Sequence, residues 1–131
     1  MHRTYLLVVT AISEAGTGLL LLVWPPLPIL LLLGVERASP EALCAARIAG
    51  AALIAISVAC WQGRNDPARP VQSDLLLGVL IYDLSAAGVL ALTGWFSGLV
   101  GIALWPAVVL HAALSAWCVA SFGKRHGKLD H

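Results

Sequence analysis

The stretch SEAGTGLLLLVW, residues 13–24, places one carboxylate, that of Glu14, in a run whose other residues are apolar or small and neutral. Of the 131 residues, 60% are hydrophobic and 11% are charged, whereas a soluble domain typically has ~25% charged residues. The apolar residues form four long blocks, residues 4–23, 41–62, 73–93 and 99–122. Each block is close to the ~20 residues that a helix needs to cross a hydrocarbon core of ~30 Å. We therefore expect Glu14 to lie inside a membrane.

The four blocks predict an all-α membrane protein. Backbone groups in lipid must be hydrogen-bonded within their own segment, so spans of this length form helices. Shorter links join the blocks, and we predict one integral membrane domain over residues 1–131, an up-down bundle of four transmembrane helices. The link PPLPILLLLGVERASPE contains an apolar run, residues 29–33, that is too short to span. We expect it to form a short interfacial or re-entrant segment after the first helix.

Basic residues near the ends of the blocks predict the orientation, because cytoplasmic loops carry an excess of Lys and Arg. The first loop has only Arg37, whereas the opposite side of the predicted bundle has Arg3, Arg64, Arg69, Lys124, Arg125 and Lys128. We predict that both termini are cytoplasmic, in an inner (plasma) membrane of the bacterial type. With a net charge of +1 and no basic stripe, the chain is not expected to bind nucleic acid.

The second block is unusually rich in small residues, which allow helices in lipid to approach closely. These residues are Ala42, Ala45, Ala46, Ala49, Gly50, Ala51, Ala52, Ala55, Ser57 and Ala59. We predict that this helix lies at the centre of the helix contacts. The small residues face more than one side, and contact with a second copy of the chain is a further hypothesis.

Each predicted span carries one ionisable residue well inside it: Glu14, Arg47, Asp83 and His111. A charged side chain near the bilayer centre costs from ~2.5 to more than ~10 kcal/mol, so such groups face the interior of the bundle and find partners. We expect the four to converge in one cluster, with Arg47 neutralising Glu14 and with Asp83 paired with His111 or with the same arginine. The supporting residues are predicted to be Thr10, Thr17, Tyr82 and Ser115.

The composition of this cluster allows two interpretations. It is either a structural device that specifies helix packing, or a site that handles protons or binds a ligand. Interhelical hydrogen bonds in membranes contribute only ~0.6 kcal/mol on average, and Ser or Thr would supply them at a lower desolvation cost, which favours the functional interpretation. We expect no metal site, because no Glu-x-x-His pair occurs in the blocks. No cofactor is identified either, since His111 lacks a second histidine at its depth for haem.

A bundle rich in leucine with a central polar cluster is typical of a site for a small amphiphile. We predict a binding module or accessory subunit that takes a lipid or a quinone, or that docks on a larger membrane complex. The alternatives are a proton-coupled transporter formed by oligomers and a small redox-type membrane enzyme, and the sequence contains no catalytic motif that would favour an enzyme. The lipid bilayer is the expected partner, and a homo-oligomer is a hypothesis.

The chain resembles the small inner-membrane proteins of the DoxX-like kind in length, four-span layout and sparse charge. The segments that carry the resemblance are EAGTGLLLLVWP in the first block, ARIAGAALIAISVACW in the second and GIALWPAVVLHAALSAWC in the last. The resemblance implies a bundle of four membrane helices. It implies no particular activity and assigns no functional residue.

Overall fold

The computed structural model describes residues 2–65 and 69–123, and every regular element in these ranges is helical. The elements are α1 (His2–Val23), α2 (Pro26–Leu33), α3 (Pro40–Gly63), α4 (Arg69–Leu92), the π-helix η1 (Thr93–Ser97) and α5 (Leu104–Gly123). The segments long and apolar enough to span a membrane are Arg3–Val23, Pro40–Gly63, Gln72–Ser97 and Leu104–Phe122. The predicted all-α fold, with four transmembrane helices and a short helix after the first, is confirmed.

Local sequence signals determine where the helices begin and end. The Ser39 side chain accepts a hydrogen bond from the amide of Ala42 at 3.3 Å, and Pro40 occupies the first turn of α3. A polar cap followed by proline is a frequent helix start. Gly98 adopts a left-handed conformation (φ 66°) and ends η1. The amides of Gly101 and Ala103 bond to carbonyl groups of α2, and α5 begins at Leu104 and not at the start of its apolar block.

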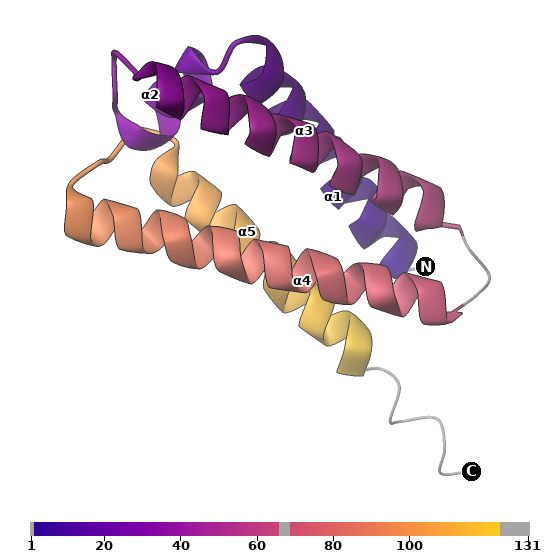
Figure 1. The fold of residues 1–131 in the computed structure, drawn as a ribbon. Helices are drawn as coiled ribbons and strands as arrows, with labels where there is room; N and C mark the ends of the chain where they lie inside the picture. Colours follow the sequence, from indigo (N-terminus) through magenta and orange to yellow (C-terminus); the bar gives the residue numbers. More distant parts are fainter. Residues whose placement is uncertain (1, 66–68, 124–131) are drawn as a thin grey trace, which may run out of the picture.

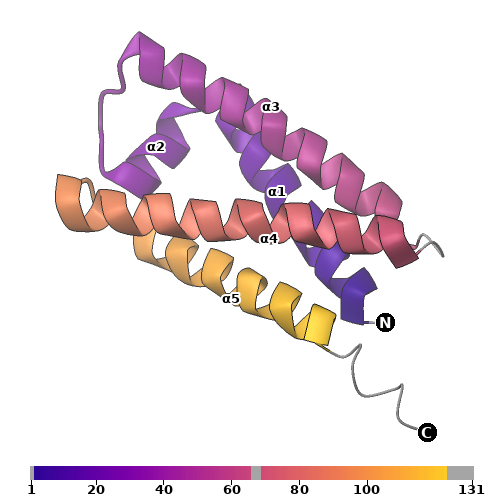
Figure 2. The same cartoon turned by 60° about the horizontal axis from the view of Figure 1, so that its bottom comes forward.

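The long helices form two antiparallel pairs, α1 with α3 and α4 with α5 (Figure 1). The start of α1, the end of α3, the start of α4 and the end of α5 lie at one end of the molecule. At the other end, α2 and the segment between η1 and α5 lie together. Figure 2 shows α2 in the region between α3 and α4 at that end. The chain therefore runs up and down through the bundle, as predicted.

The first pair is held by a contact between glycine backbones. A Cβ atom on Gly50 of α3 would lie 2.6 Å from the carbonyl oxygen of Gly18 of α1, and one on Gly18 would lie 2.8 Å from the carbonyl oxygen of Gly50. Further along, the Ser57 hydroxyl donates a hydrogen bond of 2.7 Å to the carbonyl oxygen of Ala11. Glycine allows this close approach because it has no side chain. Gly50 and Ser57 thus serve packing against α1, whereas most other small residues of α3 are exposed. The predicted position of this helix at the centre of the helix contacts is wrong, because α3 packs chiefly against α1.

The short helix α2 is attached to the segment that precedes α5. The amide of Gly101 donates to the carbonyl oxygen of Leu32 at 2.9 Å, and the amide of Ala103 donates to that of Leu31 at 2.8 Å. These bonds satisfy carbonyl groups that the end of α2 would otherwise leave unpaired. A Cβ atom at Gly101 would overlap the Leu31 carbonyl, so this position requires glycine. As a result, α2 is fixed against the end of the bundle.

Apolar side chains occupy both the interior and the outside of the bundle. The core cluster consists of Leu6, Leu7, Ala11, Cys60, Leu76, Val79, Leu114 and Cys118. Large apolar side chains are also exposed on every long helix, among them Ile12 (65%), Ile48 (67%), Val89 (63%) and Val109 (66%). An apolar exterior on helices of this length is typical of contact with lipid acyl chains. The protein is therefore a multi-pass membrane protein that sits in a lipid bilayer.

Candidate functional site

Three of the four ionisable residues predicted to converge do so. Glu14 of α1, Asp83 of α4 and His111 of α5 each offer a ligand atom, and these atoms lie within 4.8 Å of one another. Asp83 is fully buried, Glu14 is 3% exposed and the His111 side chain is 14% exposed. We call Glu14, Asp83 and His111 the polar cluster.

Helical spacing brings these side chains to the interior. On α4, Asp83 lies one turn after the buried Val79 and two turns after the buried Leu76. On α5, His111 has the buried Leu104 two turns before it and the buried Ser115 one turn after it. Asp83 and His111 thus lie on the buried face by which their helices pack in the bundle.

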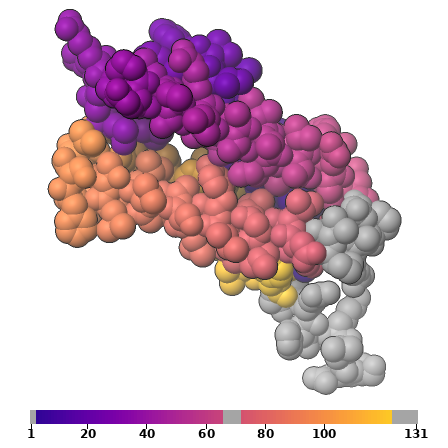
Figure 3. All heavy atoms as spheres, viewed as in Figure 1, coloured from indigo at the N-terminus to yellow at the C-terminus, as the bar shows by residue number. Residues whose placement is uncertain are grey.

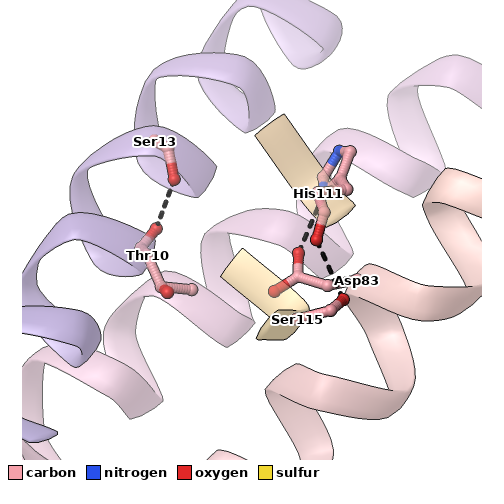
Figure 4. A network of polar contacts seen from close by, with 5 residues as sticks. All are labelled: Thr10, Ser13, Asp83, His111 and Ser115. Atoms are coloured by element: carbon pink, nitrogen blue, oxygen red, sulfur yellow. Dashed lines mark hydrogen bonds and ion pairs between the residues drawn. The ribbon is translucent and has the colours of Figure 1, made fainter. Parts of the chain in front are cut away.

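The predicted pairing of Asp83 with His111 is confirmed (Figure 4). His111 Nδ1 lies 2.8 Å from Asp83 Oδ1, and the Ser115 hydroxyl donates to the His111 backbone carbonyl at 2.9 Å. The second carboxylate oxygen, Asp83 Oδ2, is buried and has no hydrogen-bond partner in the described part of the chain. Only one of the two carboxylate oxygens of Asp83 is therefore hydrogen-bonded within the described residues.

Thr10 lies one turn before Glu14 on α1 and is fully buried. Its hydroxyl oxygen has no hydrogen-bond partner within residues 2–65 and 69–123. The Thr10 backbone carbonyl accepts a bond of 3.0 Å from the Ser13 hydroxyl. In Figure 4 the Thr10 side chain and the Asp83 carboxylate lie on facing sides of the space between α1 and α4. Two buried oxygens thus lack a partner in the described residues, which is unusual because buried polar atoms are normally paired.

Arg47 does not join the cluster, and the predicted pairing with Glu14 is wrong. The contact of Gly18 with Gly50 fixes the register of α1 against α3 and places Ile54 near the level of Glu14. Arg47 lies about two turns further along α3, ~10 Å from that level, and its side chain is exposed. Glu14 lies instead with Asp83 and His111, whose ligand atoms are within 4.8 Å of its own. The close approach of the glycine backbones, which opposite charge alone does not predict, decides this register.

The predicted supporting residues contribute in different ways. The Tyr82 ring meets the His111 ring edge-on, with centroids 5.7 Å apart and planes at 84°, and its hydroxyl interacts with Glu14. The Ser115 hydroxyl bonds to the backbone carbonyl of His111. Thr17 is exposed and lines a cavity beside the polar cluster. Tyr82 is thus the supporting residue that interacts with both Glu14 and His111.

This cavity has a volume of about 580 Å³ and lies between the two helix pairs. Its lining includes Glu14, Tyr82 and His111 at the polar cluster, whereas most other lining residues are leucines and alanines. Pro28, Leu31 and Leu32 of α2 also line it, so the short helix contributes part of its wall. Figure 3 shows the surface hollowed between α3 and α4.

The sequence did not predict the cavity or the part that α2 plays in it. Alanines of α3, α4, α5 and the segment before α5 line the space, namely Ala49, Ala52, Ala86, Ala107 and Ala103. Small residues on facing helices leave room when the helices do not close on each other, which is the signal that a search of the sequence could use. The sequence pattern predicts that the alanines of the second block serve helix packing, whereas Ala49 and Ala52 line the cavity.

The comparisons with known proteins identify no family for this chain. No family model, no curated protein and no solved structure matches it. What is known of the chain therefore comes from its own residues. It is a small protein with four helices long and apolar enough to span a membrane, and Glu14, Asp83 and His111 form a buried polar group in it.

Proposed function

We propose that the protein is a membrane binding module that takes a small amphiphile, a quinone or a neutral lipid. The head of the ligand lies at Glu14, Tyr82 and His111, and its apolar tail lies along the leucines and alanines of the cavity. The observation that carries the proposal is the cavity of about 580 Å³, which is apolar over most of its wall and polar at the cluster. Small-molecule sites typically have volumes of ~300–1,000 Å³ and a few polar groups in an apolar lining.

The charge of the cluster selects among amphiphiles. Two carboxylates lie at this site, and Arg47 is exposed at another level of α3. An anionic phosphate head would lack, at this site, the arginine that often binds phosphate. A carbonyl or hydroxyl group, in contrast, can bond to the Tyr82 hydroxyl or to an imidazole nitrogen of His111. The site therefore suits a neutral head such as that of a quinone or a diacylglycerol.

The setting of this module is also part of the proposal. The excess of Lys and Arg on one side of the bundle supports cytoplasmic termini in a bacterial-type inner membrane. The layout that resembles the DoxX-like proteins is consistent with this placement. Exposed small residues of α3 support a contact with a second copy or with a larger membrane complex, for which the module would be an accessory subunit.

A second candidate function is proton-coupled transport by an oligomer. It is supported by the proximity of two buried acids and a histidine, which is the composition of proton relays in membranes. The test is proton flux into liposomes that contain the purified protein. Transport requires flux that Glu14→Gln abolishes, whereas a binding module gives no flux above that of empty liposomes.

Ligand binding is tested with a pair of matched variants on α5. Ala107 lines the cavity, whereas Ala112 is exposed and outside the lining. Decylubiquinone and dioleoylglycerol are titrated separately into the protein in nanodiscs, and the bound amount is measured by native mass spectrometry. We expect one equivalent of one probe on the wild type and on Ala112→Phe. Binding to Ala107→Phe should be at least ~10-fold weaker, because the phenyl ring fills the cavity. Equal binding to both variants, or none to the wild type, would refute the proposal.

A further inference from the structure

Metal-ligating side chains from three different helices meet at the polar cluster. Glu14, Asp83 and His111 bring two carboxylates and one imidazole to within 4.8 Å of one another. We propose that these three residues bind one divalent transition-metal ion of the type of Zn²⁺ or Mn²⁺. The sequence expectation of no metal relied on the lack of a Glu-x-x-His pair on a single helix, whereas here each ligand comes from its own helix. The site does not depend on the amphiphile, because the chain supplies all three ligands.

A bound cation would balance the charge of the cluster when both acids are ionised. With both acids ionised, the net charge is negative even when His111 is protonated, and the nearest arginine of α3 is exposed at another level. An uncompensated charge is expensive at this depth in a bilayer. A divalent ion with two carboxylates and a neutral imidazole makes a site of zero net charge. The ion thus supplies the neutralisation that Arg47 was predicted to supply.

Two buried oxygens near the polar cluster are unpaired in the described part of the chain. Asp83 is fully buried, and its Oδ2 atom has no hydrogen-bond partner among the described residues, while Oδ1 contacts His111. The buried Thr10 hydroxyl on the facing helix also has no partner there. A carboxylate that is held by a histidine through one oxygen is oriented so that the other is available to a ligand. A proton could neutralise one acid, but it would not account for the convergence of three donors with a free oxygen.

The donor set determines the class of metal. Imidazole suits Zn²⁺ and other late first-row ions, whereas carboxylates also suit Mn²⁺. Three protein ligands leave at least one coordination position for water or for another oxygen ligand. Glu14 and His111 line the cavity, which gives the ion a route to the site. The three helices hold the ligands before the ion arrives, because their apolar faces pack independently of it.

The test measures metal content in the untagged protein, since a histidine tag would bind metal itself. After treatment with EDTA, the protein in detergent is dialysed against Zn²⁺ or Mn²⁺ and then freed of unbound metal. The bound metal per chain is measured by inductively coupled plasma mass spectrometry. We expect one ion per chain for the wild type. Asp83→Asn and Glu14→Gln keep the size of the side chain, and each should lower the affinity for the metal ion by at least ~100-fold. Loss of a group that touches only the metal's ligands typically costs less than this.

Two controls separate this site from surface binding. Glu36→Gln changes an exposed acid outside the cluster, and His126→Gln with His131→Gln removes the last two histidines of the sequence. Both should keep one ion per chain. A wild type without metal would overturn the proposal, as would equal metal in the wild type and in monodisperse Asp83→Asn. If Asp83→Asn does not fold, the wild type is still decisive, because its melting temperature must rise with added Zn²⁺ or Mn²⁺. An unchanged melting temperature counts against the site.

Discussion

The contact between α1 and α3 gives the most specific stability prediction, because two glycines with opposite surroundings can be compared. A Cβ atom at Gly50 would lie 2.6 Å from the carbonyl oxygen of Gly18 and 2.8 Å from the amide nitrogen of Leu22. Both are backbone atoms, which cannot turn aside as a flexible side chain can. Ordinary contact begins at 3.4 Å, so Gly50→Ala must separate the helices by ~0.8 Å at this point.

The magnitude follows from two opposing terms. Overpacking of a well-packed contact costs typically ~1–3 kcal/mol, whereas replacing glycine by alanine within a helix gains ~0.5–1 kcal/mol. We expect Gly50→Ala to lower the free energy of unfolding by about 1–2 kcal/mol. Gly78→Ala is the matched control on α4, since a Cβ atom there meets nothing within 4 Å. That variant should be neutral or more stable than the wild type by up to ~1 kcal/mol.

Reversible unfolding in mixed micelles, with sodium dodecyl sulfate as denaturant and tryptophan fluorescence as signal, measures both variants. The structure requires that Gly50→Ala unfold at a lower detergent fraction than Gly78→Ala. If the two variants are equally stable, or if their order is reversed, the glycine backbones do not touch. The register that separates Arg47 from Glu14 would then lose its basis.

Three further predictions concern the charged residues. A double-mutant cycle of Glu14→Gln with Arg47→Leu should be additive within ~0.5 kcal/mol in unfolding experiments, and a larger coupling would show that the two residues interact after all. The cycle of Asp83→Asn with His111→Gln should instead give a coupling energy of ~0.5–3 kcal/mol, because these groups are in contact at 2.8 Å. An additive result would show that the two side chains do not interact. Glu36→Cys should react with an impermeant maleimide from outside intact cells, because a loop with few basic residues is expected on the side away from the cytoplasm. Labelling only after lysis would contradict the proposed orientation.

The sequence predicted the helices well because the bilayer restricts the choice. Apolar runs of ~20 residues have one stable structure in lipid, so the four spans follow from composition alone. The convergence of Glu14, Asp83 and His111 follows for a related reason, since each side chain has to leave the lipid. These statements depend on the solvent around the helix and need no knowledge of its neighbours.

The details that the sequence did not predict depend on contacts between helices. Arg47 was expected at Glu14 by charge, but the contact of Gly18 with Gly50 sets the register and leaves the arginine exposed. The attachment of α2 through Gly101 depends on two backbone hydrogen bonds that no side-chain pattern indicates. The cavity likewise results from how far the two helix pairs stand apart, which the identities of the alanines alone do not determine.

The convergence of the ionisable residues is the claim on which the cavity site and the metal site both depend. Solid-state NMR on protein in lipid bilayers, with ¹³C-labelled Asp and Glu and ¹⁵N-labelled His, measures it through carbon–nitrogen dipolar couplings. The structure predicts a coupling between the Asp83 carboxyl carbon and His111 Nδ1, because Nδ1 lies 2.8 Å from Asp83 Oδ1. A weaker coupling is expected between the Glu14 carboxyl carbon and the same ring. Both signals should vanish in His111→Gln. Spectra of the wild type without a coupling from either acid to His111 would contradict the account.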